Sequence, residues 1–401
     1  MTSLKIKFRA SSTNDKRGKL YYQIIHKRSM RQIATPFTLF KCEWDQTTNT
    51  IIIDTKSSRY ELLMELRNNL SYDIKRLRNV IFNLDSQGID YSADDIVTDY
   101  TNRLELLSFT GAFTRNINNL KLIGRIRTSE TYTATLNSFK KFLNNRDIYF
   151  DMIDSAKMVQ YETYLKNSHL SMNTISFYMR TLRAVYNKGV YDNLTEDRKP
   201  FRHVYTGIDK TIKRAITAKE IRIIKETDLA SNRSLELARD LFLFSFYTRG
   251  MSFVDMSYLT THNLNDGILS YRRKKTGQLL FIKWEKCMQD IVDKYRVDCY
   301  GEYLLPIITN PLYDSRKQYL NSLSYTNKKL KKIACQIGLH TTLTMYVARH
   351  SWASIAKQNK IPISIISEGM GHDSESTTQI YLASLDTSAV DRANNIILNL
   401  I

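Results

Sequence analysis

The stretch Thr344-Met-Tyr-Val-Ala-Arg-His-Ser-Trp-Ala-Ser354 decides the fold of the C-terminal part of the chain. Its apolar residues recur at helical spacing, and Tyr346 and Arg349 share a face of this predicted helix because residues three apart are neighbours on a helix surface. An arginine within an apolar segment needs an anionic partner, since a buried unpaired charge is costly. That partner is either a protein carboxylate or a phosphate group of a substrate.

Two further segments place cations beside apolar elements. Residues 241–256 are apolar over most of their length and predict a helix that ends at Gly250 and exposes Arg249. Taken alone, this arginine is best explained by contact with the carbonyl end of the helix dipole. Residues 267–282 predict two strands joined at a Lys-Thr-Gly turn, with four consecutive cations at the tip. Such a tip is usually a solvated turn, but four cations would also make a mobile charged finger suited to phosphate.

A fourth segment, residues 369–381, contains a Gly-His pair and ends at Tyr381. In chain order, the exposed arginine, the lysine-rich hairpin, the Arg-His pair, the Gly-His pair and the tyrosine resemble the catalytic domain of the tyrosine recombinases, the phage-integrase family. The resemblance is most specific in residues 348–354 and 370–381, where the spacing from histidine to tyrosine is that of the family. It implies a mixed α/β catalytic domain over residues 215–401, which a capping-box pattern opens.

The resemblance also implies a role for each site residue. Tyr381 would be the nucleophile that attacks a DNA phosphate, giving a 3′-phosphotyrosyl link and a free 5′-hydroxyl. Arg349 would bind the non-bridging oxygens, His372 would donate a hydrogen bond to the phosphate, and Lys275 would protonate the leaving 5′-oxygen. Lys274 is a further predicted DNA contact. Because clustered cations can stabilise the transition state, we expect no metal ion, cofactor or ATP.

Two positions depart from the family pattern. The histidine expected three residues before the second arginine is Tyr346, and a phenol can donate a hydrogen bond to phosphate but is a poor general base at neutral pH. The first arginine of the family falls on Ser252. The candidate substitutes are Arg249, one turn earlier if the segment is helical, and Arg273 on the hairpin, and we prefer Arg249.

The N-terminal part of the chain looks like the arm-DNA-binding region of integrases carried by bacterial mobile elements. Residues 1–50 alternate apolar with polar or basic side chains, which predicts a small basic module of β-strands. A long helix follows over residues 57–84, and the arm domain is predicted to span residues 1–105. The strand residues predicted to contact DNA are Lys5, Lys7 and Arg9.

Residues 106–194 have helical periodicity and look like the SAM-like core-binding domain of the same integrases. The predicted helix over residues 171–188 projects Arg180 and Arg183 outward, where DNA and solvent explain the charges equally well. Residues 195–214 are polar and basic without a clear period, which predicts a linker. The fold class expected is a mainly α multidomain protein with small β elements.

The composition of the chain limits the classes of molecule that it can bind. The 401 residues include 59 Lys and Arg against 40 Asp and Glu, and the formal charge of +19 points to a polyanionic partner, most often nucleic acid. The resemblance implies that this partner is double-stranded DNA with recombination sites. A basic surface that meets only solvent is the alternative. The four cysteines lack the close pairs of zinc or disulfide frameworks and are predicted to be reduced core thiols. Without a visible export signal or an apolar run of about 18 residues, we expect a cytoplasmic, nucleoid-associated protein without membrane contact.

Two other functions remain open from the residues alone. A catalytically idle DNA-binding regulator would keep the scaffold and the charge but has no need of Tyr381. A type IB topoisomerase shares the phosphotyrosine chemistry but has less use for the basic module at residues 1–50. The resemblance further implies a homotetramer on DNA, accessory DNA-bending proteins, and a last segment, residues 389–401, that docks on a neighbouring protomer or on its own domain. It does not separate integration and excision from inversion.

Overall fold

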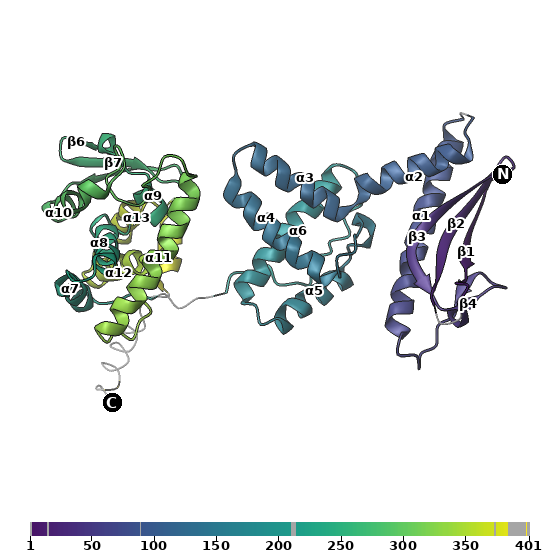
Figure 1. Ribbon diagram of the computed structural model, residues 1–401, viewed down its shortest axis with the longest axis horizontal. Helices are drawn as coiled ribbons and strands as arrows, with labels where there is room; N and C mark the ends of the chain where they lie inside the picture. Colours follow the sequence, from purple (N-terminus) through teal and green to yellow (C-terminus); the bar gives the residue numbers. More distant parts are fainter. Residues whose placement is uncertain are drawn as a thin grey trace. The chain divides into compact units, whose positions relative to one another are not determined.

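The computed structural model in Figure 1 describes residues 2–13, 16–88, 90–209, 214–372, 374–383 and 398, without the side chains of Thr377, Ile380, Tyr381 and Ala383. The chain divides into two compact units, Met1–Asp209 and Lys210–Ile401. Helices dominate both units, and small antiparallel sheets make up the rest of the regular structure in the described ranges. The prediction of a mainly helical multidomain protein with small sheets is therefore confirmed.

The first unit begins with an N-terminal module of strands and helices. Alternate residues of its second strand are buried, so one face of the sheet packs while the other faces outward. A long helix covers the packed face (Figure 1). Its buried leucines belong to the same hydrophobic core as the strand residues. The elements are β1 (Ser3–Arg9), β2 (Gly18–His26), β3 (Ser29–Leu39), β4 (Trp44–Asp45), β5 (Thr50–Ile51), α1 (Tyr60–Ser86) and α2 (Ala93–Leu107).

The rest of the first unit is a helical bundle. Its core is rich in aromatic rings, and Phe109 lies edge-on against Phe139 and Phe150 with ring centroids 6.1 and 5.2 Å apart. Ser108 and Ser171 cap the first and last helices of the bundle through their side-chain oxygens. The helices are α3 (Phe109–Leu122), α4 (Ile126–Phe142), α5 (Ser155–Asn167) and α6 (Met172–Tyr191).

Residues 195–209, which the sequence assigns to a linker, pack on this bundle instead. Phe201 and Val204 are buried in the bundle core. The backbone N–H of Tyr205 donates to the carboxylate of Glu162 on α5 at 3.1 Å. The segment has no helical or strand period, so its two buried side chains were not recognisable from spacing. The predicted boundary therefore moves to the junction of the two units, after residue 209.

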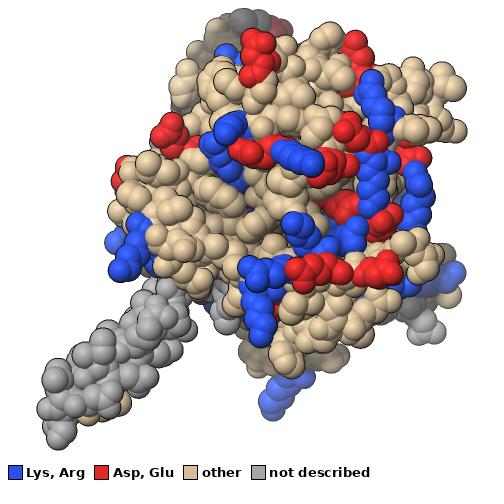
Figure 2. Space-filling model, turned by 90° about the vertical axis from the view of Figure 1, so that its left-hand side faces the viewer, with Lys and Arg blue, Asp and Glu red and all other residues tan. Residues whose placement is uncertain are grey.

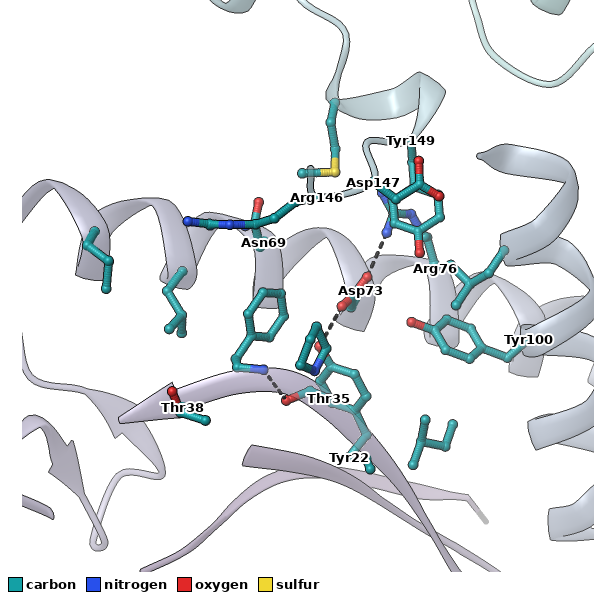
Figure 3. Close-up of a pocket in the computed structure, with 18 of the residues that line it drawn as sticks. Tyr22, Thr35, Thr38, Asn69, Asp73, Arg76, Tyr100, Arg146, Asp147 and Tyr149 are labelled. Atoms are coloured by element: carbon teal, nitrogen blue, oxygen red, sulfur yellow. Dashed lines mark hydrogen bonds and ion pairs between the residues drawn. The ribbon is translucent and has the colours of Figure 1, made fainter. Parts of the chain in front are cut away.

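A pocket of about 480 Å³ lies where the N-terminal module meets the bundle within the first unit (Figure 3). Arg76 of α1 forms ion pairs there with Asp73 on its own helix at 2.6 Å and with Asp151 of the bundle at 2.5 Å. Its guanidinium carbon also lies 4.1 Å from the ring centroid of Tyr149. Because Arg76 is only 7% exposed, these contacts satisfy a buried charge and tie α1 to the bundle.

The second unit is built around helix α8 (Arg233–Tyr247), of which the run from Leu241 to Phe244 is entirely buried. Helices α11 (Ser315–Gln336) and α12 (Met345–Gln358) pack against it. The remaining elements are α7 (Ala218–Glu226), α9 (Phe253–Ser257), the antiparallel sheet of β6 (Leu264–Asn265), β7 (Ile268–Arg272) and β8 (Leu279–Lys283), and the helices α10 (Lys286–Tyr295), α13 (Ile363–Met370) and α14 (Glu375–Ala383).

The capping-box pattern at the start of the second unit forms as predicted. Thr217 Oγ1 accepts a hydrogen bond from the backbone N–H of Glu220 at 3.2 Å, and the Glu220 carboxylate accepts one from the Thr217 backbone N–H at 2.6 Å. Both interactions satisfy N–H groups that a helix start would otherwise leave unpaired. The box therefore fixes the first turn of α7.

The prediction that the cysteines are core thiols is wrong. Cys42 and Cys335 are exposed, and Cys287 and Cys299 are only partly buried. All four are unpaired thiols. Among the described residues, no three His, Cys, Asp or Glu side chains gather as a metal site would require. No described helix combines the length and the apolar character needed to cross a membrane.

Candidate active site

Arg349 lies at the centre of the candidate site, on α12. It is 5% exposed and donates hydrogen bonds to the carbonyl oxygen of Gly250 at 2.9 Å and to that of Met370 at 2.6 Å. Its Nη2 also lies 3.1 Å from Nε2 of His372. A Cβ on Gly250 would lie 2.6 Å from the Cα of Arg349, and Gly250 has a φ of +74°, so only glycine lets the chain pass this close. The guanidinium is thus held in place by three separate elements.

A second arginine side chain binds the same backbone turn, at the end of α13. Arg273, just after β7, is 7% exposed and donates through Nη1 to the carbonyl oxygen of Gly371. Gly371 ends α13 with a left-handed φ of 62°, and a Cβ there would lie 2.8 Å from Cδ of Arg273. The missing side chain of Gly371 therefore leaves room for Arg273. Two arginines from distant segments meet at the end of α13, next to His372.

Arg249 occupies a different position from the one predicted. Helix α8 ends at Tyr247, and Arg249 has a left-handed φ of 61°, so no helical turn connects it to Ser252. Its Cδ lies 3.6 Å from the position that a Cβ on Gly369 would take, which places the side chain beside α13. Ser252 is the N-cap of α9 and donates to the carboxylate of Asp255 at 2.6 Å.

The hairpin tip is anchored rather than a mobile finger. Arg273 turns inward, as described, and the backbone N–H of Lys274 donates to the buried carboxylate of Asp255 at 2.8 Å. The ammonium of Lys274 lies 4.3 Å from the ring centroid of Tyr258. Lys275 is exposed. The four cations of the tip therefore differ in environment, and Lys275 is exposed on an anchored turn.

Several charged groups of the site affect the pKa of the Tyr271 phenol. Burial is the main cause that raises the pKa of this phenol above its usual value, and Asp255 adds to the rise. The positive charges of Arg273, Arg349 and Arg249 oppose it. All three guanidinium groups are therefore close enough to influence one buried phenol.

Tyr346 and Arg349 occupy successive turns of α12, as the spacing predicts. Tyr346 is 57% exposed, and its ring meets that of His350 edge-on with centroids 4.6 Å apart. The phenol is therefore accessible to a ligand that reaches Arg349 from solvent.

Tyr381 lies in α14, one turn after the fully buried Thr378. The position of the Tyr381 side chain is outside the described part of the structure. The oxygen of Thr378 lies 2.7 Å from Nδ1 of His372. His372 therefore links Arg349 to the helix that carries Tyr381. Residues 389–401, predicted to dock on a protomer, lie outside the described residues apart from Leu398.

The residues predicted to bind DNA in the first unit are distributed over two elements. Lys5 and Arg9 are exposed on the outer face of β1, while Lys7 on the same face donates to Asn49 at 3.3 Å. On α6, Arg180 is exposed and Arg183 is half-buried. Figure 2 turns the left-hand side of Figure 1, the side of the second unit, toward the viewer, and on that face Lys and Arg are interspersed with Asp and Glu. That face lacks the single sign of charge that a surface following DNA phosphates needs.

Two residues of the site were not singled out from the sequence as members of it. Thr378 lies in the motif before the tyrosine, but nothing in the sequence shows that its hydroxyl meets His372. Asp255 stands where the family pattern has an acidic residue, but that pattern does not show that its carboxylate accepts the backbone N–H of Lys274. The Ser252-Phe-Val-Asp255 sequence is itself a capping-box pattern, and reading it as one would have predicted the helix start at α9 and hence the break after Arg249.

Comparison with known proteins agrees with this architecture. The model of the phage integrase SAM-like domain matches residues 108–205, and that of the phage integrase family matches residues 258–388. Tyrosine recombinase XerC of Pediococcus pentosaceus is 22% identical over 262 residues, which cover 64% of this chain and 86% of that protein. Tyrosine recombinase XerA of Pyrococcus furiosus is 27% identical over 243 residues, covering 57% and 77%.

Solved structures share the fold. A lambda integrase dimer bound to a core site matches with a TM-score of 0.54 at 14% identity over 94% of both chains. The Tn1549 transposon integrase in complex with transposon right end DNA matches with a TM-score of 0.52 at 14% identity, over 73% of this chain and 99% of that one. With the cationic site on α12, the β7–β8 hairpin and the turn before α14, these matches establish that the chain belongs to the tyrosine recombinase family of phage integrases, site-specific enzymes that cut and rejoin DNA.

Proposed function

We propose that this recombinase cuts DNA with Tyr381, which attacks the scissile phosphate to form a 3′-phosphotyrosyl link and release a 5′-hydroxyl. The observation that carries the proposal is the placement of Arg349, Arg273 and His372 around the turn that leads into α14, the helix of Tyr381. Guanidinium groups there would stabilise the charge that builds up on the phosphate oxygens. The phosphotyrosyl link keeps the energy of the broken bond, so the free 5′-hydroxyl of another strand can reverse the reaction.

In this scheme Arg273 supplies the first arginine of the site, in preference to Arg249. Arg273 and Arg349 donate to the carbonyl oxygens of two successive residues, and this common anchor supports the proposal that they bind one phosphate together. Arg249 lies against α13, on a backbone that turns away at a left-handed residue. The preference drawn from the sequence is thereby reversed in our proposal.

Two side chains complete the proposed chemistry. Lys275, exposed beside the anchored turn, protonates the 5′-oxygen as it leaves. Tyr346, exposed one turn before Arg349, donates a hydrogen bond to the phosphate where the family pattern has a histidine. His372 donates to the phosphate as well, once Nε2 carries a proton.

DNA binding is proposed to involve both units. A lambda integrase dimer bound to a core site matches 69% of this chain, and a lambda integrase tetramer bound to a Holliday junction matches 92% of it. We infer that this chain likewise acts as a homotetramer on paired double-stranded sites, with Arg180, Arg183 and Lys274 on core DNA. The outer face of β1, with Lys5, Lys7 and Arg9, would bind a separate arm site. Integration and inversion would use this same chemistry and differ in the arrangement of sites.

The deciding experiment uses nicked duplexes that carry the inverted repeats flanking the gene, so that the cut strand loses its 5′-hydroxyl end and the adduct accumulates. Wild-type protein and Tyr381→Phe are incubated with them in EDTA and resolved on a denaturing gel. We expect a covalent protein–DNA adduct with the wild type alone. Tight binding without an adduct on sites validated by footprinting would favour an idle DNA-binding regulator. An adduct formed by Tyr381→Phe would show that another residue is the nucleophile.

A second measurement on the same protein distinguishes a topoisomerase from a recombinase. Relaxation of a supercoiled plasmid that lacks the repeats would indicate a type IB relaxing enzyme. Exchange of labelled arms between two duplexes that carry the repeats would indicate recombination. We expect exchange that depends on both repeats.

A further inference from the structure

His372 bridges the phosphate-binding arginine and the nucleophile helix. Its Nε2 lies 3.1 Å from Nη2 of Arg349, and its Nδ1 lies 2.7 Å from Oγ1 of Thr378. Thr378 is fully buried on α14, three residues before Tyr381. Residues three apart lie one above the other on a helix, so a constraint on Thr378 also constrains the turn that carries Tyr381. The imidazole is therefore held between two parts of the proposed machinery.

The chemistry of the two contacts fixes the proton on the imidazole ring. A guanidinium has only N–H groups and can only donate, so Nε2 of His372 must accept the hydrogen bond from Arg349. An imidazole that accepts at Nε2 is neutral and carries its hydrogen on Nδ1. Nδ1–H then donates to the hydroxyl oxygen of Thr378. In the DNA-free protein His372 is thus the Nδ1–H tautomer.

We propose that Thr378 is a positioning residue for His372, a role that rests on the proposed function of Tyr381. The hydroxyl accepts from Nδ1–H and holds the ring so that Nε2 points at Arg349 and at the phosphate that Arg349 would bind. When a phosphate takes over the Arg349 N–H that faces the ring, Nε2 takes a proton from solvent and donates a hydrogen bond to the phosphate, while Nδ1–H stays on Thr378. The threonine thereby keeps the ring orientation unchanged between the free and the DNA-bound enzyme.

The hydroxyl group is what this role requires. Valine has nearly the shape of threonine but offers no acceptor, so Thr378→Val would remove the hydrogen bond between His372 Nδ1 and the buried position 378. Thr378→Ser keeps the hydroxyl and should keep the function. Thr326, a buried threonine of α11, provides a matched control because Thr326→Val makes the same change elsewhere in the second unit.

The first test reads the tautomer directly on the full chain without DNA. The protein has seven histidines, so ring-15N-histidine labelling gives a spectrum in which His372 is assigned by its loss in His372→Gln. Protonated and unprotonated ring nitrogens differ widely in 15N shift. We expect Nδ1 protonated and Nε2 unprotonated in the wild type, Thr378→Ser and Thr326→Val, and a loss of this pattern in Thr378→Val. A wild-type His372 that is protonated on Nε2 alone would overturn the inference.

The second test follows adduct formation on the nicked duplex under single-turnover conditions. Loss of one hydrogen bond to a positioned group should slow Thr378→Val about tenfold, while Thr378→Ser and Thr326→Val react at close to the wild-type rate. Equal rates and equal 15N spectra for wild type and Thr378→Val would refute the role of the hydroxyl. So would a Thr378→Ser variant as slow as Thr378→Val, because that result would indicate packing alone.

The two proposals fail in different ways. If the wild type forms no adduct, both the proposed function of Tyr381 and the catalytic part of this inference are wrong. The 15N spectrum still shows whether Nδ1–H of His372 binds Thr378. If the wild type reacts and Thr378→Val matches it, only the role of Thr378 falls. Circular dichroism and thermal melting of each variant show that a slow rate does not reflect unfolding.

Discussion

Arg273 and Arg349 donate hydrogen bonds to successive carbonyl oxygens, those of Gly371 and Met370, although one follows a β-strand and the other lies on a helix. A single turn of backbone thus sets the spacing of both guanidinium groups. Planar guanidinium groups held side by side match the oxygens of one phosphate. This relationship makes the assignment of Arg273 testable against Arg249.

Arg273→Ala should slow adduct formation by roughly 10²–10³-fold, the usual effect of removing one donor from a charge-stabilising site. Arg249→Ala is the matched control, with the same residue change at the competing position, and should cost much less. Single-turnover rates on the nicked duplex measure both. A larger loss for Arg249→Ala than for Arg273→Ala would reverse the assignment.

Lys275→Ala should lose the protonation of the leaving 5′-oxygen, which costs about 10²–10⁴-fold in rate. A duplex with sulfur in place of the bridging 5′-oxygen needs no such proton, because a thiolate leaves readily. We therefore expect the sulfur substrate to restore Lys275→Ala but not Arg349→Ala. Equal rescue of both variants would mean that Lys275 acts on the phosphate oxygens instead.

Gly250→Ala should both destabilise the second unit and abolish adduct formation, because the new Cβ would lie 2.6 Å from the Cα of Arg349. Gly267 offers a control with nearly the same backbone, at φ +73°, and no atom within 4 Å of an added Cβ. Gly267→Ala should cost about 1 kcal/mol from its left-handed backbone alone. Gly250→Ala should lower the free energy of unfolding in urea by clearly more than Gly267→Ala does. Similar losses for the two would show that the approach to Arg349 relaxes freely.

Arg76→Ala should destabilise the first unit by about 3 kcal/mol, since it leaves the carboxylates of Asp73 and Asp151 without their buried cation. The exposed pair of Arg127 and Glu130 gives the control, and Arg127→Ala should change stability by less than about 1 kcal/mol. Both changes in stability are measured by urea unfolding of the full chain, from the first transition in which helical signal is lost. A small effect of Arg76→Ala would mean that α1 is held to the bundle by apolar contacts alone.

Binding of arm DNA should depend on the outer face of β1. Replacing Lys5 and Arg9 by glutamine removes two cations and should make the slope of log K against log salt shallower by about 2, at roughly 0.9 for each lost phosphate contact. The control is the double glutamine variant of Lys41 and Lys56, which are exposed on the same module. Filter binding over a range of salt concentrations gives the slopes. Equal slopes for both variants would exclude β1 as the phosphate-binding strand.

Local patterns in the sequence predicted much of the site, and tertiary packing decided the rest. The helix of Arg349, the hairpin and the Gly-His turn each have a local signature, so their presence and order could be predicted. The left-handed conformation of Arg249 could not, because non-glycine residues rarely adopt it and Gly250, the usual residue for such a conformation at a helix end, follows directly. The inward turn of Arg273 depends on the space left by Gly371, a residue far away in the chain.

The cap at Ser252 has a consequence for how this enzyme could change. Ser252 and Asp255 start α9 together, and Asp255 also holds the hairpin through the backbone of Lys274. An arginine at position 252 would remove that cap and crowd a region that already holds Arg273. We therefore expect the effect of an arginine at position 252 to depend on the residue at position 273. A substitution at either position acts on the hairpin through the same carboxylate.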